Sequence, residues 1–315
     1  MFLMGIADYV GLVSGIGLCI VLGANNLSTC LGSSVGVRAI KYRQALVLAS
    51  LGLFAGILLE GYKVSGAINS GIVRSNDPKF TIAVELSSLL LMSIITYRRI
   101  PVSLSQVAIG AAIGSGLARG ISVNWSFAAI VAASWLLTPL VGFTLSLILS
   151  SATSLPAKRH RRILRLNLFY AYLTVMSGVY AAYALGANTV GFIVGMNEVS
   201  GLPSPLLSTV FAFATIVGMI TLGRGTTQSV AENIIGLNPS ASFAAQMGGA
   251  ITVHGFTQVG IPVSVSQAVV GGIFGAAVPR KIVVRNGRLT REILFGWTVA
   301  PLLGAMLGFV AGLMI

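Results

Sequence analysis

The sequence predicts an all-α integral membrane protein made of two inverted-topology repeats, with broken helices, re-entrant hairpins and about ten to twelve membrane segments. The first observation is composition: of 315 residues, 55% are hydrophobic and only 9% are charged, so side chains that solvate a globular surface are scarce. The second is a set of polar motifs that recur inside apolar runs. The third is a reversal of charge between equivalent loops.

Apolar runs near the length of a membrane span follow one another along the whole chain. A helix needs roughly 20 apolar residues to cross a bilayer, and several of the runs reach or exceed that length. In chain order the runs occupy 3–22, 44–60, 80–97, 122–151, 166–196, 204–222, 240–259 and 293–315.

A polar motif interrupts the first long run and returns once. Gly23-Ala-Asn-Asn26 is matched 163 residues later by Gly186-Ala-Asn-Thr189. Polar groups in hydrocarbon must be satisfied by protein or by a ligand, so we expect a helix break in each half at Asn25, Asn26, Asn188 and Thr189. Their side-chain oxygens either cap the break or help to hold a monovalent cation such as Na⁺.

Two further motif pairs keep nearly the same spacing. Pro101-Val-Ser-Leu-Ser-Gln106 matches Pro262-Val-Ser-Val-Ser-Gln267 at an offset of 161 residues, and Trp135 with Pro139 matches Trp297 with Pro301 at an offset of 162. Three motifs in one order at one spacing indicate a duplication. We therefore predict a first repeat at 1–150, a basic cytoplasmic linker at 151–165 and a second repeat at 166–315.

Charge placement predicts that the repeats are inverted. The loop after the first motif holds Arg38, Lys41 and Arg43, whereas its counterpart near 197–205 has no basic residue. After the second motif the pattern reverses: the first copy has only Arg119, and the second has Arg280, Lys281, Arg285, Arg288 and Arg291. By the positive-inside rule equivalent loops lie on opposite sides, which predicts a multi-pass protein of the cell membrane with both termini outside. Arg98 and Arg99 do not fit this count.

Short segments at 61–73 and 225–237, and the stretches after each Pro-Val-Ser, are too brief for complete spans. We interpret them as half-helices or re-entrant hairpins whose serines cap exposed amides. Helix N-termini and hydroxyl or amide donors together suit an oxyanion. The expected anion-binding residues are Ser33, Ser34, Ser103, Ser105, Gln106, Ser264, Ser266 and Gln267. The alternative is that these serines only permit close helix packing.

Three carboxylates in or beside apolar segments are candidates for coupling transport to a cation: Glu60, Glu85 and Glu232. For Glu60 and Glu85 the alternative is a structural pair with Lys63, Lys79 or Arg98. His254 is interpreted as a packed or hydrogen-bonded side chain, and His160 belongs to the basic linker.

Enzyme chemistry and nucleic-acid binding are poorly supported. The chain has no Gly-Lys dipeptide for a phosphate-binding loop, and its two histidines stand far apart. Basic residues group in short loops such as Lys158-Arg-His-Arg-Arg162, so they predict cytoplasmic loops rather than a nucleic-acid surface. We expect no enzyme activity, no cofactor and no metal beyond Na⁺.

At these residues the chain resembles the PiT family of inorganic phosphate transporters over nearly its whole length. The matching positions are Gly23-Ala-Asn-Asn26 with Gly32-Ser-Ser-Val35, Glu60-Gly61, Pro101-Val-Ser103, Trp135 with Pro139, and their second-half partners. The resemblance implies symport of phosphate with Na⁺ or H⁺. The chain departs from the family where Asn26 and Thr189 replace aspartate, and where Leu104-Ser-Gln106 and Val265-Ser-Gln267 replace Thr-Thr-His.

The predicted function is secondary transport of a tetrahedral oxyanion by alternating access, with phosphate as the expected anion and Na⁺ or H⁺ as the coupling ion. A sulfate permease of the same fold remains an alternative, since a site without carboxylates suits a dianion. A non-transporting anion sensor or scaffold is a third reading, and an enzyme acting on a lipid phosphate is a fourth. The expected partners are inorganic phosphate or sulfate and membrane lipids, and a homo-oligomer is compatible with the sequence.

Overall fold

The computed structural model describes residues 5–98, 102–159, 163–198, 201–202, 204–223, 238–281 and 287–315, which are almost entirely helical. Its first half contains α1 (Ile6–Gly36), α2 (Tyr42–Glu60), α3 (Tyr62–Ser65), the π-helix η1 (Ala67–Ile72), α4 (Pro78–Tyr97), α5 (Leu104–Ala118) and α6 (Trp125–Arg159). The second half contains α7 (Ile163–Leu185), the π-helix η2 (Gly186–Val190), α8 (Gly191–Asn197), α9 (Ser204–Thr221), α11 (Pro239–Gln258), α12 (Val265–Ala277), the 3₁₀ turn η4 (Val278–Arg280) and α13 (Gly287–Met314).

Within this part of the chain, 7 helices are long and apolar enough to span a membrane. The prediction of an all-helical, multi-pass membrane protein is therefore confirmed. The run expected at 240–259 forms α11, which is not among the 7. Its buried face carries Ser242, Gln246 and Thr252 together with glycines and alanines, so α11 packs inside the protein instead of presenting an apolar surface.

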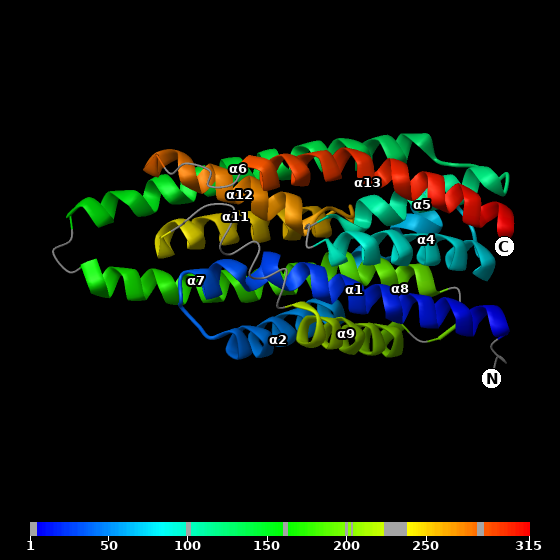
Figure 1. The fold of residues 1–315 in the computed structure, drawn as a ribbon, viewed down its shortest axis with the longest axis horizontal. Coiled ribbons are helices and arrows are strands. Elements are labelled where there is room, and N and C mark those ends of the chain that lie inside the picture. Colours follow the sequence, from blue (N-terminus) through cyan, green and yellow to red (C-terminus); the bar gives the residue numbers. More distant parts are fainter. Residues whose placement is uncertain are drawn as a thin grey trace.

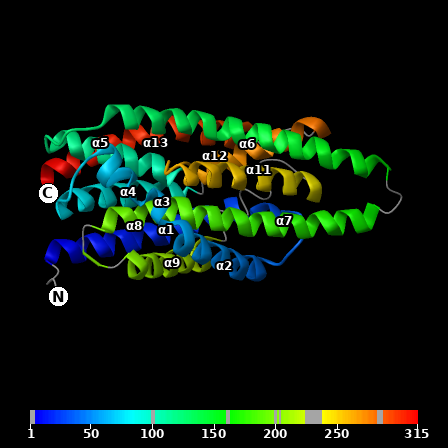
Figure 2. The same ribbon diagram turned by 180° about the vertical axis from the view of Figure 1, so that it is seen from behind.

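The helices form one elongated bundle with both chain termini at the same end (Figures 1 and 2). The α1–α2 connection and the C-terminal end of α6 lie toward the opposite end (Figures 1 and 2). Helices α4 and α5 occupy the part of the bundle next to the termini, and α11 and α12 occupy the other part. The end of α4 and the start of α5 lie near the middle of the bundle, as do the end of α11 and the start of α12.

Polar caps begin the four helices of these two hairpins at equivalent positions. Asp77 accepts a hydrogen bond from the backbone of Lys79 at the start of α4, and Asn238 accepts one from Ala241 at the start of α11; a proline follows each cap. Such caps satisfy amides that the helix itself leaves unpaired. Ser103 and Ser264 cap α5 and α12 in the same way, so the predicted serine caps are confirmed.

Glycines let helices from different halves approach to backbone contact, and they do so in matched pairs. A Cβ on Gly23 in α1 would lie 1.9 Å from the carbonyl oxygen of Thr215 in α9. A Cβ on Gly186 in η2 would lie 2.2 Å from the carbonyl oxygen of Leu53 in α2. Small residues at such crossings allow close van der Waals packing, which holds helices together in lipid.

Helices of the two sequence halves interleave in space. Helix α5 packs against α13, where a Cβ on Gly110 would lie 2.1 Å from the carbonyl oxygen of Pro301. Helix α12 packs against α6, where a Cβ on Gly271 would lie 2.2 Å from the carbonyl oxygen of Pro139. Each half thus supplies a partner helix to the other, and residues 1–150 do not form a separate compact body.

The helix break expected at the first polar motif is not found. Helix α1 continues without a break from Ile6 to Gly36 through Asn25 and Asn26. Gly23 of the motif serves instead for close contact between α1 and α9. The second motif is distorted: Gly186–Val190 form a π-helical turn between α7 and α8. Segment 225–237 with Glu232, the side chain of Arg99, and His160 in the linker lie outside the described residues.

Candidate functional site

A small polar cavity lies where the repeated motifs meet. Its walls are formed by Asn26, Ser103, Leu104, Ser105, Thr189, Val263, Ser264, Val265 and Ser266. All four polar motifs contribute, although they are far apart in the sequence. None of these side chains is charged, so a ligand here would meet hydroxyl, amide and backbone groups only.

Two helix N-termini end at the cavity. Ser103 and Ser264 are the N-cap residues of α5 and α12, and their hydroxyl oxygens accept the backbone N–H groups of Gln106 at 3.3 Å and Gln267 at 3.1 Å. Each cap pairs with a second hydroxyl, Ser103 with Ser105 at 3.0 Å and Ser264 with Ser266 at 2.9 Å. The positive ends of two helix dipoles and four hydroxyls therefore converge, an arrangement that favours an anion.

Asn188 positions one wall of the cavity. Its side-chain oxygen accepts the backbone N–H of Val263 at 3.0 Å, and its amide donates to the Thr257 hydroxyl at 3.0 Å and to the Ile261 carbonyl at 3.1 Å. Asn25 makes the equivalent contact in the first half, donating to the Thr96 hydroxyl at 3.2 Å. Asn188 thus holds the loop that carries Ser264 and Asn25 holds the end of α4, whereas Asn26 and Thr189 face the cavity itself.

The other expected anion-binding residues lie away from the cavity walls. Ser34 is buried and donates to the carbonyl of Thr174 at 3.1 Å. It lies eight residues beyond Asn26 in α1, about 12 Å along the helix axis, and Ser33 is its neighbour. Gln106 and Gln267 are buried beside the serines, and the Oε1 atom of each has no hydrogen-bond partner among the described residues.

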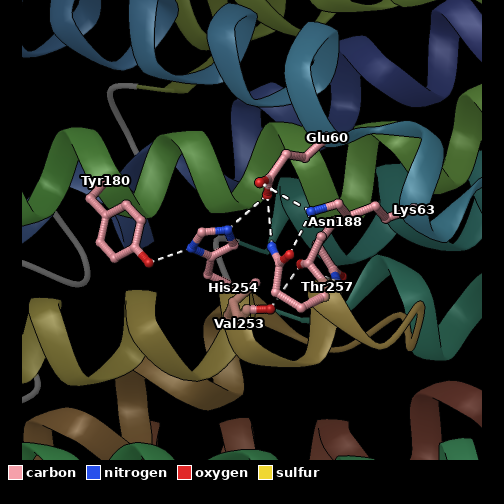
Figure 3. Close-up of polar contacts among 8 residues, drawn as sticks. Glu60, Lys63, Tyr180, Asn188, Val253, His254 and Thr257 are labelled. Carbon is pink, nitrogen blue, oxygen red and sulfur yellow. Dashed lines mark hydrogen bonds and ion pairs between the residues drawn. The ribbon is translucent and has the colours of Figure 1, made fainter.

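Glu60 lies in a separate cluster of ionisable groups at the end of α2 (Figure 3). Its carboxylate contacts Lys63 Nζ at 3.2 Å, His254 Nε2 at 2.7 Å and Gln258 Nε2 at 2.9 Å. The other ring nitrogen of His254 is hydrogen-bonded to the Tyr180 hydroxyl. The expected pairing of Glu60 with Lys63 is present, and His254 is hydrogen-bonded as interpreted.

Glu85 lies in a third environment, fully buried on α4. Its two oxygens contact the Ser14 hydroxyl at 2.7 Å and the Asn197 amide at 2.5 Å. No basic side chain of the described residues forms a salt bridge with it, so the suggested pair with Lys79 or Arg98 is absent there. Glu232 falls in the part of the chain that the structure leaves undescribed.

The residues that sequence reasoning missed are those that join the motifs to their surroundings. Tyr180 and Gln258 complete the Glu60 cluster, and Thr257 holds Asn188. None of them belongs to a repeated motif, and a hydroxyl or an amide inside an apolar run is common in membrane helices. Only their distances to Glu60 and Asn188 identify them.

The described residues contain no group of three or more His, Cys, Asp or Glu side chains that could hold a metal ion. A cation at the cavity would therefore depend on neutral oxygens, such as those of Asn26 and Thr189, and on backbone carbonyls.

Comparison with known proteins connects this fold and cavity to one family. Residues 22–308 match the model of the phosphate transporter family. A candidate phosphate permease of Methanocaldococcus jannaschii is 30% identical over 298 residues, covering 95% of this chain and 94% of its own. The chloroplastic inorganic phosphate transporter 2-1 of Arabidopsis thaliana is 22% identical and covers 96% of this chain and 71% of its own.

Among solved structures, one described as the sodium-dependent phosphate transporter superposes with a TM-score of 0.90 at 19% identity, covering 98% of each chain. At that identity the likeness establishes the fold. This chain and that transporter therefore share an all-helical fold.

Proposed function

Because this chain belongs to the phosphate transporter family, we propose that it is a secondary transporter that carries inorganic phosphate across the membrane through the serine-lined cavity. The observation that carries the proposal is the convergence of two capped helix N-termini on a cavity walled by uncharged donors. Four hydroxyls and two helix dipoles can replace the water that phosphate loses on leaving solution. Phosphate is preferred to sulfate because the matching family and relatives are named for phosphate.

The assignment of individual residues follows their places around the cavity. Ser103, Ser105, Ser264 and Ser266 bind the anion, and Asn26 and Thr189 complete the cavity with side-chain oxygens that suit a cation such as Na⁺ less well than a carboxylate would. Asn188 holds the loop before α12 in place, and Asn25 holds the end of α4. Gln106 and Gln267 lie behind the cavity walls, next to the serine caps that accept their backbone N–H groups, whereas Ser34 serves α1 packing beside Ser33.

Alternating access is proposed to involve the hairpins rather than the sequence halves. The α4–α5 pair and the α11–α12 pair lie in opposite parts of the bundle and bring their serines to the same cavity (Figures 1 and 2). Relative movement of the two pairs would open the cavity first to one end and then to the other. Inverted repeats are supported by the matched contacts of Gly23 with Thr215 and of Gly186 with Leu53.

The proposed location is the cell membrane with both termini outside. The end of the bundle opposite the termini carries the α1–α2 connection with Arg38 and Lys41, the turn η4 with Arg280, and the C-terminal end of α6 (Figure 1). Basic connections of this kind favour the cytoplasmic side.

Uptake into proteoliposomes tests this function. Purified protein should accumulate labelled phosphate, unlabelled phosphate and arsenate should compete, and sulfate should compete weakly. Repeating the assay with and without Na⁺, at two pH values, identifies the coupling ion. Strong competition by sulfate with no uptake of phosphate would instead identify a sulfate permease, and binding of phosphate without flux would identify a sensor.

A further inference from the structure

The cluster of Glu60, Lys63, His254, Gln258 and Tyr180 brings ionisable side chains together within the membrane-spanning bundle (Figure 3). The side chains of Glu60, Lys63 and His254 are 20%, 22% and 25% exposed, so they are mostly shielded yet remain open on one side. Charged groups in a membrane protein persist where they pair with one another or meet water, and they commonly mark proton or ion pathways.

The cluster exists once among the described residues, although the sequence repeat supplies positions equivalent to its members. At the repeat offsets of 161–163 residues, the positions that correspond to Glu60, His254, Gln258 and Tyr180 are Leu222, Ser93, Tyr97 and Gly17. None of these four can pair a carboxylate with an imidazole. The repeated fold thus does not require an ionisable cluster at this place, because the equivalent positions carry none.

Hydrogen bonds and adjacent residues connect the cluster to the cavity. Gln258 donates to Glu60, and its neighbour Thr257 accepts from Asn188. Asn188 in turn holds the backbone of Val263, which lines the cavity next to Ser264. A change in the hydrogen bond between His254 and Glu60 can therefore be transmitted to the N-terminus of α12, which carries Ser264 and Ser266.

His254 can exist in two protonation states within the same set of partners. In the neutral ring, Nε2–H donates to Glu60 and the Tyr180 hydroxyl donates to Nδ1. When a proton binds, Nδ1–H donates to the Tyr180 oxygen, and the tyrosine hydroxyl turns to another acceptor. Histidine is the side chain whose charge ordinarily changes near neutral pH, and Glu60 is placed to balance the added charge.

The ionisable groups around His254 are few. From α2 it meets Glu60, from α3 Lys63 reaches the same carboxylate, and from α7 the rings of Tyr180 and Tyr183 lie edge-on at centroid distances of 5.4 Å and 5.7 Å. The sequences of α12 and η2 hold no ionisable side chain. The ionisable side chains of α6 lie at the far end of that helix, and those of α1 are Asp8, Tyr9 and two buried cysteines. With His254 neutral, Lys63 balances Glu60, so one added proton leaves the cluster with one positive charge.

We infer that His254, paired with Glu60, is the proton-binding site that couples phosphate transport to H⁺ in this chain. Asn26 and Thr189 leave the cavity without a carboxylate, so a protein side chain that takes up the coupled proton must lie outside its walls. A proton on His254 adds a positive charge to the cluster that hydrogen bonds and adjacent residues connect to the cavity, and this charge strengthens phosphate binding. By linkage, bound phosphate strengthens proton binding to the same degree.

This inference rests on the proposed function, and its test separates the two. Phosphate affinity of the purified full chain would be measured without Na⁺ at several pH values between 5.5 and 8, for wild type and for His254→Gln. Phosphate itself changes protonation in this range, but equally for both proteins. We expect the wild type to gain on the order of 10-fold more affinity than the variant from pH 8 to pH 6.

Proton uptake on phosphate binding gives a second readout, recorded with a pH indicator in weak buffer. It should be smaller in His254→Gln than in the wild type. His160→Gln is the matched control, since it removes the other histidine of the chain, and it should keep the wild-type pH profile. If His254→Gln fails to fold, Glu60→Gln takes its place, because it removes the charge that favours protonated His254.

Equal pH profiles and equal proton uptake in wild type and His254→Gln overturn the inference while leaving phosphate transport intact. Absence of phosphate binding and uptake by the wild type at every pH overturns the proposed function, and the inference with it.

Discussion

The side-chain oxygen of Asn188 accepts the backbone N–H of Val263 at 3.0 Å, so a residue of one repeated motif fixes the loop of the other. Its amide also holds Thr257 and the carbonyl of Ile261. This one side chain satisfies a donor and two acceptors at the turn between α11 and α12. Buried backbone groups at such a turn have few alternative partners.

Replacing Asn188 by Ala should lower stability and phosphate uptake together. The change removes three hydrogen bonds and leaves the buried N–H of Val263 unpaired, which should cost about 3 kcal/mol or more. Thermal unfolding in detergent measures the loss. Asn124→Ala is the comparison, because Asn124 is exposed and only caps Phe127, so its loss should cost about 1 kcal/mol. Equal effects of the two changes would contradict the role given to Asn188.

Replacing Ser105 or Ser266 by Ala should weaken phosphate binding and leave the fold intact. These hydroxyls line the cavity but do not cap α5 or α12, since Ser103 and Ser264 do so. Loss of one hydrogen bond to a charged ligand should reduce affinity roughly 10-fold or more. Ser50→Ala removes a hydroxyl that only bonds its own helix and is the control. Unchanged phosphate affinity in both cavity variants would place the anion elsewhere.

Asn26→Asp should make phosphate binding depend on Na⁺. Asn26 lines the cavity and donates to the carbonyl of Leu22 at 3.3 Å, so an aspartate would set a carboxylate oxygen against that carbonyl and against the anion. A bound cation would relieve both repulsions. Without Na⁺ we expect affinity to fall about 10-fold or more, and Na⁺ should restore it. Titration of phosphate with and without Na⁺ checks this, and indifference to Na⁺ would refute it.

Gly186→Ala should destabilise the bundle, whereas Gly255→Ala should not. The added methyl at Gly186 would lie 2.2 Å from the carbonyl oxygen of Leu53, but at Gly255 nothing lies within 4 Å. We expect Gly186→Ala to cost about 3 kcal/mol through overpacking, and Gly255→Ala to gain about 0.5–1 kcal/mol from helix propensity. Unfolding temperatures of the two variants, compared in one detergent, decide between close packing and a purely local preference for glycine.

Glu85→Gln should retain transport if Glu85 is structural. Glu85 accepts hydrogen bonds from the Asn197 amide at one oxygen and from the Ser14 hydroxyl at the other, and that hydroxyl also reaches the carbonyl of Gly11. A glutamine would still accept from Asn197 and would donate to the Ser14 oxygen while Ser14 donates to Gly11, so uptake should stay within about 2-fold. Glu85→Ala leaves the Ser14 hydroxyl and the Asn197 amide without this hydrogen-bond acceptor and should lower the unfolding temperature. Loss of uptake in a stable Glu85→Gln protein would make Glu85 a coupling carboxylate.

The fold class could be predicted from the sequence because the hydropathy of each membrane span is a sum over its own residues and needs no tertiary contact. It also placed Ser103 and Ser264 as helix caps, since capping depends on a few neighbouring residues. It expected a break in α1 at Asn25 and Asn26 and was wrong there. A glycine such as Gly23 permits either a helix break or close contact with another helix. Only the position of Thr215 in α9 shows that Gly23 is used for close contact.

The connection of His254 to Tyr180 and Gln258 could not be predicted for a similar reason. His254 and Tyr180 are 74 residues apart, and neither belongs to a repeated motif. Their meeting follows from how α7 packs on α11, which is a property of the assembled bundle. Sequence periodicity reports the face of one helix but not which residue faces it from another.

Interleaving of the two halves has a consequence for how the protein is made. Helix α5 has left the ribosome long before its packing partner α13, because α5 spans Leu104–Ala118 and α13 begins only at Gly287. Until then the groove at Gly110 and Gly114, which Pro301 and Ala305 fill in the finished bundle, stays without its partner. Membrane insertion of α5 and completion of the transporter are therefore separate events in time. A ribosome that stops before residue 287 leaves one of the two serine hairpins without the helix that supports it.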